Sequence, residues 1–291
     1  MDRRTFFLTP GAGLLCSLSG LPIKNARADS GNLLDALRDI EATARGRLGV
    51  HFIDTATGRE LGWRSDERFL MLSSFKLLAS ALVLARADRG DDSLDRRIRY
   101  RQQDLVPWSP ITEKHVGGDG LSLAQLCEAT ITTSDNTAAN LILASYGGPA
   151  ALTAFARLLG DTVTRLDRTE PELNFRSTSG DSLDTTSPRA MAHTIGKLLV
   201  GDALKPSSRE RLMQWLLANT TGGKRLRAGT PADWRVGEKT GTAGNDANDV
   251  GIALPPQRAP LIVTAYLAES ATDGATRDAA LSSVGRLMAR L

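Results

Sequence analysis

The residues best suited to chemistry are Ser73 and Lys76, which lie three positions apart before an apolar run from Leu77 to Ala85. Residues i and i+3 share one face of a helix, so the lysine amine can reach the serine hydroxyl. The unpaired N–H groups and positive dipole end of a helix N-terminus favour a serine alkoxide or a developing oxyanion. Such a pair could activate a serine without a histidine, although serine is also a common helix cap.

Four segments further along the chain carry polar groups that would decide whether Ser73 is an activated nucleophile or only a helix cap. They are Ser134-Asp135-Asn136, the run from Arg168 to Asn174 that contains Glu170, Thr220–Arg225, and Lys239-Thr240-Gly241-Thr242. Each also has an ordinary structural interpretation, because S-D-N is typical of a turn or helix cap and K-T-G of a strand that ends in a turn. The run from residue 168 to about 186 lacks periodicity, and loops of this length in compact domains are usually functional or disordered.

The elements that must position these groups predict an α+β fold. Helical spacing predicts a helix over residues 31–45, and residues 48–53 and 59–63 flank a turn typical of a β-hairpin. Residues 70–215 have a largely helical pattern. Strand character returns at 234–239, 249–254 and 261–267, and a last helix is expected over 276–290. We therefore expect one antiparallel sheet built from both chain ends, flanked by the terminal helices, with an inserted all-helical region.

The same pattern predicts three segments with different roles. Arg3-Arg4 begins a charged stretch of twin-arginine type, a mildly apolar stretch follows, and Ala26-Arg27-Ala28 resembles a cleavage site, so residues 1–28 are predicted to be a signal peptide. The alternative for this segment is a disordered tail. Residues 29–64 and 216–291 are predicted to form the α/β sheet domain, and 65–215 the all-helical domain. The mature protein is then expected to be periplasmic or secreted, with twin-arginine export as a hypothesis.

Charge and composition argue against several classes of partner. The formal net charge is +3, but removal of residues 1–28 takes away four of 36 basic and one of 33 acidic residues, which leaves 32 of each. A neutral mature chain gives no support for nucleic-acid binding. No apolar run reaches the ~18 residues of a membrane span, so no stable membrane association is expected after processing. Only Cys127 remains in the mature chain, in a helix pattern that predicts a buried residue without a disulfide.

The histidines give no sign of a metal site. His51, His115 and His193 are widely separated and match no known spacing of metal ligands. We therefore expect no metal and no cofactor.

Taken together and in this order, the motifs resemble those of the class A serine β-lactamases, a family of penicillin-recognising serine enzymes. The resemblance extends over nearly all of the mature chain. It implies hydrolysis of the β-lactam ring of penicillins and cephalosporins through an acyl-serine intermediate, which gives antibiotic resistance, by a monomer that acts on small molecules.

The resemblance also implies a role for each matching residue. Ser73 is the implied nucleophile, Lys76 shares in its deprotonation, Ser134 protonates the departing nitrogen, and Glu170 is the base for deacylation. Whether Glu170 or Lys76 is the base for acylation is left open. The residues implied in binding substrate or water, or in the oxyanion hole, are Asn136, Asn174, Lys239, Thr240, Gly241, Thr242, Arg225 and Trp108. For Trp108, which matches an aromatic wall of the cleft, a core position is the alternative.

Some features depart from the family pattern or leave rivals open. Arg168 and Asp184 resemble the pair that holds the neck of the glutamate loop, but the spacing from Asn174 to Asp184 is one residue longer than usual. Ser80 occupies the position that often forms a disulfide with Cys127. Leu72 and Ala243 replace the cysteines of some carbapenem-hydrolysing relatives, which disfavours that subtype. The rivals are a penicillin-binding D,D-peptidase, which typically lacks a base like Glu170, and a non-catalytic β-lactam-sensing module.

Overall fold

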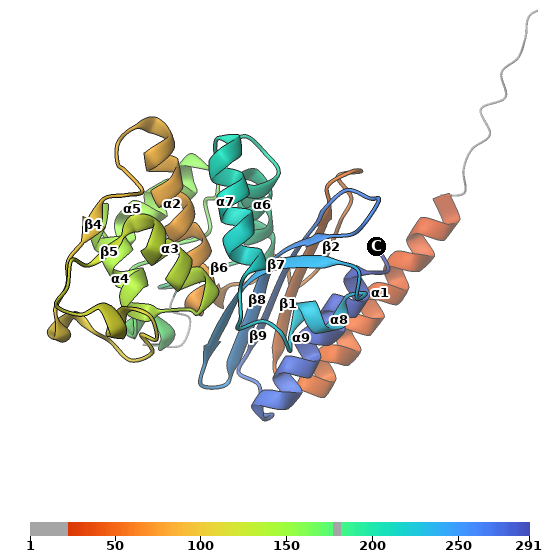
Figure 1. The fold of residues 1–291 in the computed structure, drawn as a ribbon. Helices are drawn as coiled ribbons and strands as arrows, with labels where there is room; N and C mark the ends of the chain where they lie inside the picture. Colours follow the sequence, from red (N-terminus) through yellow and green to blue (C-terminus); the bar gives the residue numbers. More distant parts are fainter. Residues whose placement is uncertain (1–22, 177–181) are drawn as a thin grey trace, which may run out of the picture.

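The strands form one five-stranded antiparallel sheet assembled from both ends of the chain (Figure 1). The computed structural model describes residues 23–176 and 182–291, with side chains from residue 31 onward. The strand order is β2-β1-β9-β8-β7. The bounds are β1 (Arg47–Asp54), β2 (Glu60–Trp63), β7 (Arg235–Ala243), β8 (Asp246–Leu254) and β9 (Leu261–Ala268). The predicted hairpin, the three C-terminal strands and the α+β class are confirmed.

The two faces of this sheet are covered by different helices. The terminal helices α1 (Ile23–Ala44) and α9 (Gly274–Met288) lie side by side against one face, where they bury a core that includes Leu37 and Val284 (Figure 1). On the other face, α6 (Pro188–Leu199) packs against β1 and β9, and α7 (Pro206–Leu217) packs against β7. The sheet is therefore a buried middle layer, which explains why its central strands are apolar on both faces.

The helical region is built around α2 (Phe75–Arg89), most of which is buried. Every residue of α2 from Phe75 to Ala85 is buried, as expected of a helix that is apolar all round. The helices around it are α3 (Leu123–Thr132), α4 (Asn136–Ser145) and α5 (Pro149–Leu158), with α8 (Leu226–Gly229) next to α9. Two short strand pairs complete the described region, β3 (Phe69–Leu70) with β6 (Thr185–Thr186) and β4 (Arg97–Ile98) with β5 (Leu121–Ser122).

Two sequence expectations about element boundaries need correction. The K-T-G motif does not end a strand, because β7 continues through it to Ala243 and pairs with β8 along that whole length. The first helix begins at Ile23 rather than near residue 31, so the predicted cleavage site at residues 26–28 falls within α1. The charged stretch at Arg3-Arg4 and Cys16 lie outside the described residues.

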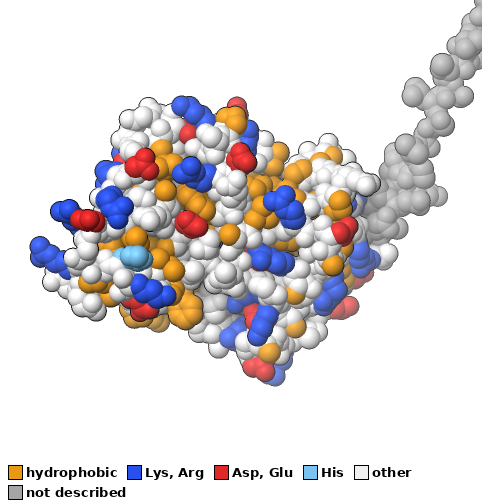
Figure 2. Space-filling view, viewed as in Figure 1, with side chains coloured by type: hydrophobic (Ala, Val, Ile, Leu, Met, Phe, Trp, Pro, Cys, Tyr) orange, Lys and Arg blue, Asp and Glu red, His pale blue; other side chains and the backbone are white. Residues whose placement is uncertain are grey.

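Surface and cysteine properties follow the composition. On the face shown in Figure 2, basic and acidic side chains are interspersed rather than gathered in one patch. Within the described residues no single helix is long and apolar enough to cross a membrane, and only the bent pair α4 and α5 reaches the required length and composition together. Cys127 is a buried free thiol, as predicted, and its burial raises its pKa to about 12 while Ser80 opposes the shift.

Candidate active site

Ser73 lies in a strained turn directly before the buried helix α2. A short 3₁₀ turn, Leu72–Ser74, leads into α2 at Phe75, so Ser73 precedes the helix that carries Lys76. Leu72 has a φ of +49°, in the left-handed region that a branched side chain rarely adopts. Such strain is typical of functional sites, where surrounding packing holds a side chain in place. The turn and the buried helix together fix the position of the Ser73 hydroxyl.

Lys76 contacts most of the polar groups of the site. Its side chain is fully buried, and its Nζ lies 3.0 Å from Ser73 Oγ, 3.2 Å from Ser134 Oγ and 3.0 Å from Glu170 Oε1. The amine also donates to Asn136 Oδ1 at 2.5 Å. Burial lowers the pKa of Lys76, and the Glu170 carboxylate opposes that shift. The fall in pKa makes the neutral amine, which can accept a proton, easier to reach than for a lysine in water.

Asp135 holds the S-D-N segment against the wall of the cleft. Its buried carboxylate caps α4 by accepting from the N–H of Ala138. The same carboxylate accepts from the N–H groups of Ile111 and Thr112. Ser134, just before it, has a φ of +61°, and this conformation accompanies the approach of its Oγ to Lys76. Asp135 therefore supports the two side chains that flank it in the motif.

The buried carboxylate of Glu170 contacts both Ser73 and Lys76. Glu170 Oε1 accepts from Ser73 Oγ at 3.3 Å, and Oε2 accepts from Asn174 Nδ2 at 2.6 Å. Asn140, on α4, binds the backbone of Glu170 at both its N–H and its carbonyl, at 2.9 and 2.8 Å. The sequence indicated no role for Asn140. These two hydrogen bonds from the Asn140 side chain attach the backbone of Glu170 to α4 and so fix the position of the glutamate loop.

The neck of this loop is closed by the predicted ion pair. Arg168 Nε lies 2.6 Å from Asp184 Oδ2, and the buried Asp184 also accepts from the N–H groups of Asp167 and Arg168. The guanidinium further donates to the carbonyl of Phe175. The pairing of Arg168 with Asp184 is therefore confirmed. Most of the segment in which we predicted an extra residue, 177–181, lies outside the described residues.

Lys239 and Thr240 reach the site from the edge strand β7. Lys239 Nζ donates to Ser134 Oγ at 3.0 Å, so Ser134 accepts from two buried amines. Burial lowers the pKa of Lys239 well below its usual range, and the nearby positive charge of Lys76 adds to that effect. Thr240 Oγ1 lies within hydrogen-bond distance of Thr221 Oγ1. The result is a row of hydroxyl and amine groups along one wall, suited to an anionic substrate group.

Gly241 is required by the close approach of β7 to the nucleophile. A Cβ at this position would lie 2.9 Å from Leu72 Cβ, 3.1 Å from the carbonyl oxygen of Met71 and 3.2 Å from the backbone nitrogen of Ser73. Real Cβ atoms almost never make contacts as short as the first of these. The glycine therefore lets the strand lie directly against the turn that carries Ser73, which explains the residue type in K-T-G.

We predict that Gly241→Ala lowers kcat/KM for benzylpenicillin, a substrate of the class that the family resemblance implies, by roughly 10–100-fold, because displacement of a reacting group by about 1 Å can cost that much. Steady-state hydrolysis assays check this. Gly223→Ala is the matched control, since no atom lies within 4 Å of a Cβ there and the position is exposed. Equal activity of the two variants would show that β7 tolerates the added methyl group without moving Ser73.

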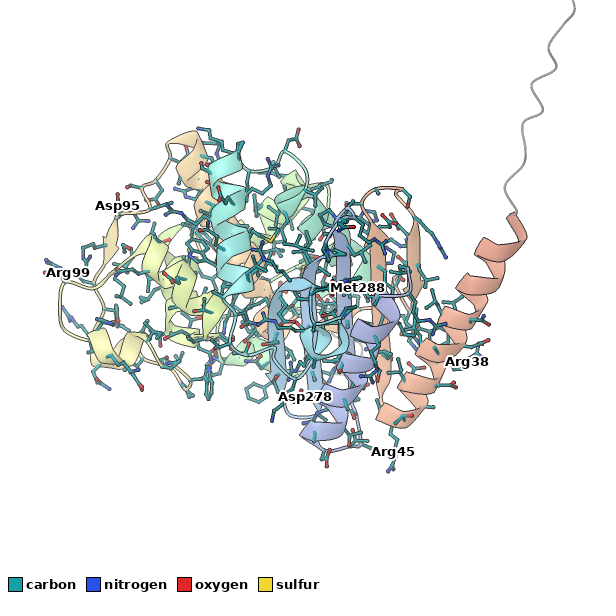
Figure 3. The ribbon with its side chains drawn as sticks, turned by 45° about the vertical axis from the view of Figure 1, so that its right-hand side comes forward. Arg38, Arg45, Asp95, Arg99, Asp278 and Met288 are labelled. Carbon is teal, nitrogen blue, oxygen red and sulfur yellow. The ribbon has the colours of Figure 1, made fainter. Side chains whose placement is uncertain are left out.

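Arg225 lies behind β7 rather than in the cleft. Its side chain is buried and binds four groups. They are Asp278 at 2.8 Å, the carbonyls of Gly241 and Asn248 at 2.9 and 2.8 Å, and Thr242 Oγ1 at 2.7 Å. Asp278 projects from α9 (Figure 3). The predicted role of Arg225 in carboxylate binding stays a prediction; in the structure its guanidinium holds the Gly241 carbonyl and Thr242 Oγ1 rather than lining the cleft.

Ser73, Glu170 and other side chains of the site line a cleft of about 390 Å³ between the helical region and the sheet. Trp108 stands at its rim with 66% of its surface exposed and its Nε1 donating to the carbonyl of Thr133, so the alternative of a core tryptophan was wrong. Thr221, in the predicted segment Thr220–Arg225, also lines the cleft, although the sequence motifs assigned this residue no role of its own. The lining residues are Ser73, Trp108, Ser134, Asn136, Glu170, Asn174, Thr221, Thr240 and Thr242.

A buried carboxyl pair lies directly behind Lys239. Glu238 is fully buried next to Asp249 on the paired strand, with Arg227 Nε 3.1 Å from its Oε1. Burial, followed by the charge of Asp249, raises the pKa of Glu238 far above the ordinary 4.5. The native state therefore keeps a proton that the unfolded chain loses, and the free energy of unfolding falls as pH rises between the two pKa values.

We predict that Glu238→Gln stabilises the protein in alkaline solution by on the order of 1 kcal/mol, since one pKa unit corresponds to about 1.4 kcal/mol. Glutamine has the shape of the protonated acid but loses no proton on unfolding. Thermal unfolding between about pH 5 and pH 9 checks this, with the gap in Tm between variant and wild type widening as pH rises. Glu210→Gln, at an exposed position of α7, is the control. Parallel pH profiles for wild type and Glu238→Gln would contradict the prediction.

Comparison with known proteins gives a consistent set of relatives. A family model described as the β-lactamase enzyme family matches residues 32–290. A β-lactamase from Streptomyces albus G is 45% identical over 99% of this chain and 96% of its own length. β-Lactamase L2 from Stenotrophomonas maltophilia is 44% identical over 100% of this chain and 99% of its own. The solved structure of an ancestral class A β-lactamase is 60% identical, with a TM-score of 0.86 over 88% of this chain and 98% of that one.

Proposed function

This chain belongs to the class A family of serine β-lactamases, and from that premise we propose that it hydrolyses the β-lactam ring of penicillins and cephalosporins and so gives resistance to them. The observation that carries the proposal is the position of Ser73 Oγ, 3.0 Å from Lys76 Nζ and 3.3 Å from Glu170 Oε1. A nucleophile in contact with two groups that can act as bases can both form an acyl intermediate and lose it.

In the acylation step, Ser73 Oγ attacks the carbonyl carbon of the lactam. The proton of the hydroxyl passes to Lys76 or to Glu170, both of which are within reach. The backbone N–H groups of Ser73 and Thr242 are proposed to bind the oxyanion, and the close packing of Gly241 against the Ser73 nitrogen supports this. The C–N bond then breaks, and Ser134, in contact with two lysine amines, gives a proton to the departing nitrogen.

In the deacylation step, Glu170 takes a proton from a water molecule that attacks the ester carbonyl. The Glu170 carboxylate and the amide of Asn174, which are hydrogen-bonded to each other at 2.6 Å, are suited to orienting that water. The ester bond to Ser73 breaks, the proton returns to its oxygen, and the opened product leaves. No cofactor takes part in either step.

Substrate recognition is assigned to the two walls of the cleft. Lys239 and Thr240 are proposed to bind the carboxylate of the antibiotic, with Thr242 held in place by Arg225. Asn136, which projects from the opposite wall, is proposed to bind the side-chain amide of the substrate. The exposed Trp108 would then cover the apolar part of the ligand at the rim.

The test is mass spectrometry of the purified protein mixed with benzylpenicillin. Rapid conversion of the substrate to a product heavier by one water, with no lasting protein adduct, supports the proposal. A stable adduct on the wild-type protein would instead point to the D,D-peptidase or the sensor. The buried contact of Glu170 with Ser73 argues against both rivals, because a base in that position serves turnover.

We also propose that the mature enzyme acts outside the cytoplasm as a monomer, after removal of residues 1–28. The support is the sequence pattern of the segment, with its paired arginines and its Ala26-Arg27-Ala28 site. Intact-mass measurement of the protein recovered from the periplasm checks the cleavage, and sedimentation checks the oligomeric state. A periplasmic protein that retains residue 1 would contradict the proposed processing.

A further inference from the structure

Two histidines and a glutamate that are far apart in the sequence meet on the sheet face that carries α6. His51 lies on β1, Glu60 begins β2, and His193 lies on α6. His51 Nε2 lies 3.0 Å from Glu60 Oε2, and His193 Nε2 lies 3.2 Å from Glu60 Oε1. The two rings are 5.9 Å apart between centroids. The spacing of the histidines along the sequence could not predict this meeting, because three separate elements supply the groups.

The donor atoms of this cluster match those of a transition-metal site in type and spacing. One atom from each of the three residues falls within 4.8 Å of the other two. In a tetrahedral zinc site with bonds of about 2.0–2.1 Å, neighbouring donor atoms lie about 3.4 Å apart, close to the two histidine-to-carboxylate distances. Two imidazoles and one carboxylate leave further positions for water, an arrangement common in proteins that bind such ions.

The surroundings of His51 allow either tautomer of its ring, including the one that a metal needs. Ser65 Oγ lies 3.1 Å from His51 Nδ1 and 3.2 Å from the carbonyl oxygen of Val50. When the single hydroxyl proton is donated to that carbonyl, His51 donates from Nδ1 and keeps a lone pair on Nε2, facing Glu60. Most metal-binding histidines are oriented in this way, by a hydrogen bond from the ring nitrogen that does not bind the metal.

A glycine leaves the space for this pair. Gly62 stands opposite His51 on β2, and a Cβ there would lie 1.7 Å from Ser65 Oγ and 2.8 Å from His51 Nδ1. The local backbone is thus shaped to keep the buried imidazole and its serine partner together.

Charge and access are also compatible with a cation. Arg189 donates to Glu60 Oε2 at 2.9 Å, but it also binds Asp66 through Nε at 2.9 Å and Nη2 at 3.3 Å. The Glu60 and Asp66 carboxylates together carry one more negative charge than Arg189 neutralises. Arg189 can therefore stay paired with Asp66 when Glu60 coordinates an ion. His193 is about half exposed and lines a surface cavity, which gives an ion a path from solvent.

We propose that His51, Glu60 and His193 bind a divalent transition-metal ion such as Zn²⁺. The ion links the edge hairpin of the sheet to α6, at a site separate in its residues from the catalytic cleft. Its effect is on the stability of the folded enzyme, because a ligand that binds only the folded state raises Tm.

The test is calorimetric titration of tag-free, chelator-treated protein with Zn²⁺, and the visible spectrum of the protein with Co²⁺. We expect one Zn²⁺ per chain, a Co²⁺ spectrum altered by imidazole ligands, and a rise in Tm with Zn²⁺. His193→Ala should weaken Zn²⁺ binding by at least about 10–100-fold, the size of effect seen even for residues that only orient metal ligands. Its hydrolysis of benzylpenicillin in the absence of metal should equal that of wild type.

Two further variants separate this site from non-specific binding. His115→Ala removes the exposed third histidine and should leave Zn²⁺ affinity unchanged. Arg189→Gln removes the competing cation beside Glu60 and should tighten binding, an effect that loss of a purely structural ion pair would not produce. Equal Zn²⁺ affinity in wild type and His193→Ala, or loss of binding in His115→Ala alone, would overturn the proposal.

Discussion

Glu170→Gln should trap benzylpenicillin on Ser73 as a covalent acyl-enzyme. Glutamine keeps the size of the side chain and its contact with Asn174, but it cannot accept a proton from water. Loss of a general base typically costs about 10²–10⁴-fold, so deacylation should fall by that factor and become rate-limiting. Mass spectrometry should show one equivalent of adduct within the first turnover, and peptide mapping should place it on Ser73.

The neighbouring residue Glu172 supplies the control for this experiment. It is exposed and begins the short 3₁₀ turn Glu172–Asn174, two residues after Glu170, so Glu172→Gln changes the same charge without removing the carboxylate that faces Ser73. It should turn over benzylpenicillin at the wild-type rate. The double variant Ser73→Ala/Glu170→Gln should form no adduct. Full turnover by Glu170→Gln would mean that another group activates the water, and an adduct on the double variant would mean that Ser73 is not the nucleophile.

Lys76→Met should lower the acylation rate by about 10²–10⁴-fold, the other large effect that we expect. Methionine fills similar space in the buried position, but it removes the amine that contacts Ser73, Ser134, Asn136 and Glu170. Proton transfer from the nucleophile and to the departing nitrogen would both lose their shared partner. Stopped-flow measurement of acylation with benzylpenicillin checks the prediction, since it separates acylation from the later release of product.

Two controls accompany the Lys76→Met variant: a test that it is folded, and the loss of a lysine charge elsewhere on the surface. Removing one partner of a buried ion pair destabilises proteins by about 3–5 kcal/mol, so a measured Tm and circular dichroism spectrum must show that Lys76→Met is folded at the assay temperature. Lys224→Met, at an exposed lysine, should acylate as wild type does. If folded Lys76→Met acylates normally while Glu170→Gln fails to acylate at all, Glu170 is the base for both steps.

The order of helices and strands could be predicted from the sequence because each of them depends on the local periodicity of apolar residues. The turn between β1 and β2 and the apolar run of α2 are both local features, formed by residues that are near neighbours in the chain. The pairing of Ser73 with Lys76 is also local, three residues apart, and the structure places their side chains 3.0 Å apart. The boundary of β7 was missed because threonine and glycine in K-T-G are common at strand ends.

The residue types of the site, the strand-bracketed helical region and the family resemblance could all be recognised from the amino-acid sequence. The position of Arg225 behind β7, the exposure of Trp108 at the rim and the meeting of His51 and His193 at Glu60 became evident only from the folded chain. These contacts join segments far apart in the chain, and their distances depend on how helices pack on the sheet. Spacing along a chain reports which neighbours share a face, whereas packing alone decides which distant side chains share a site.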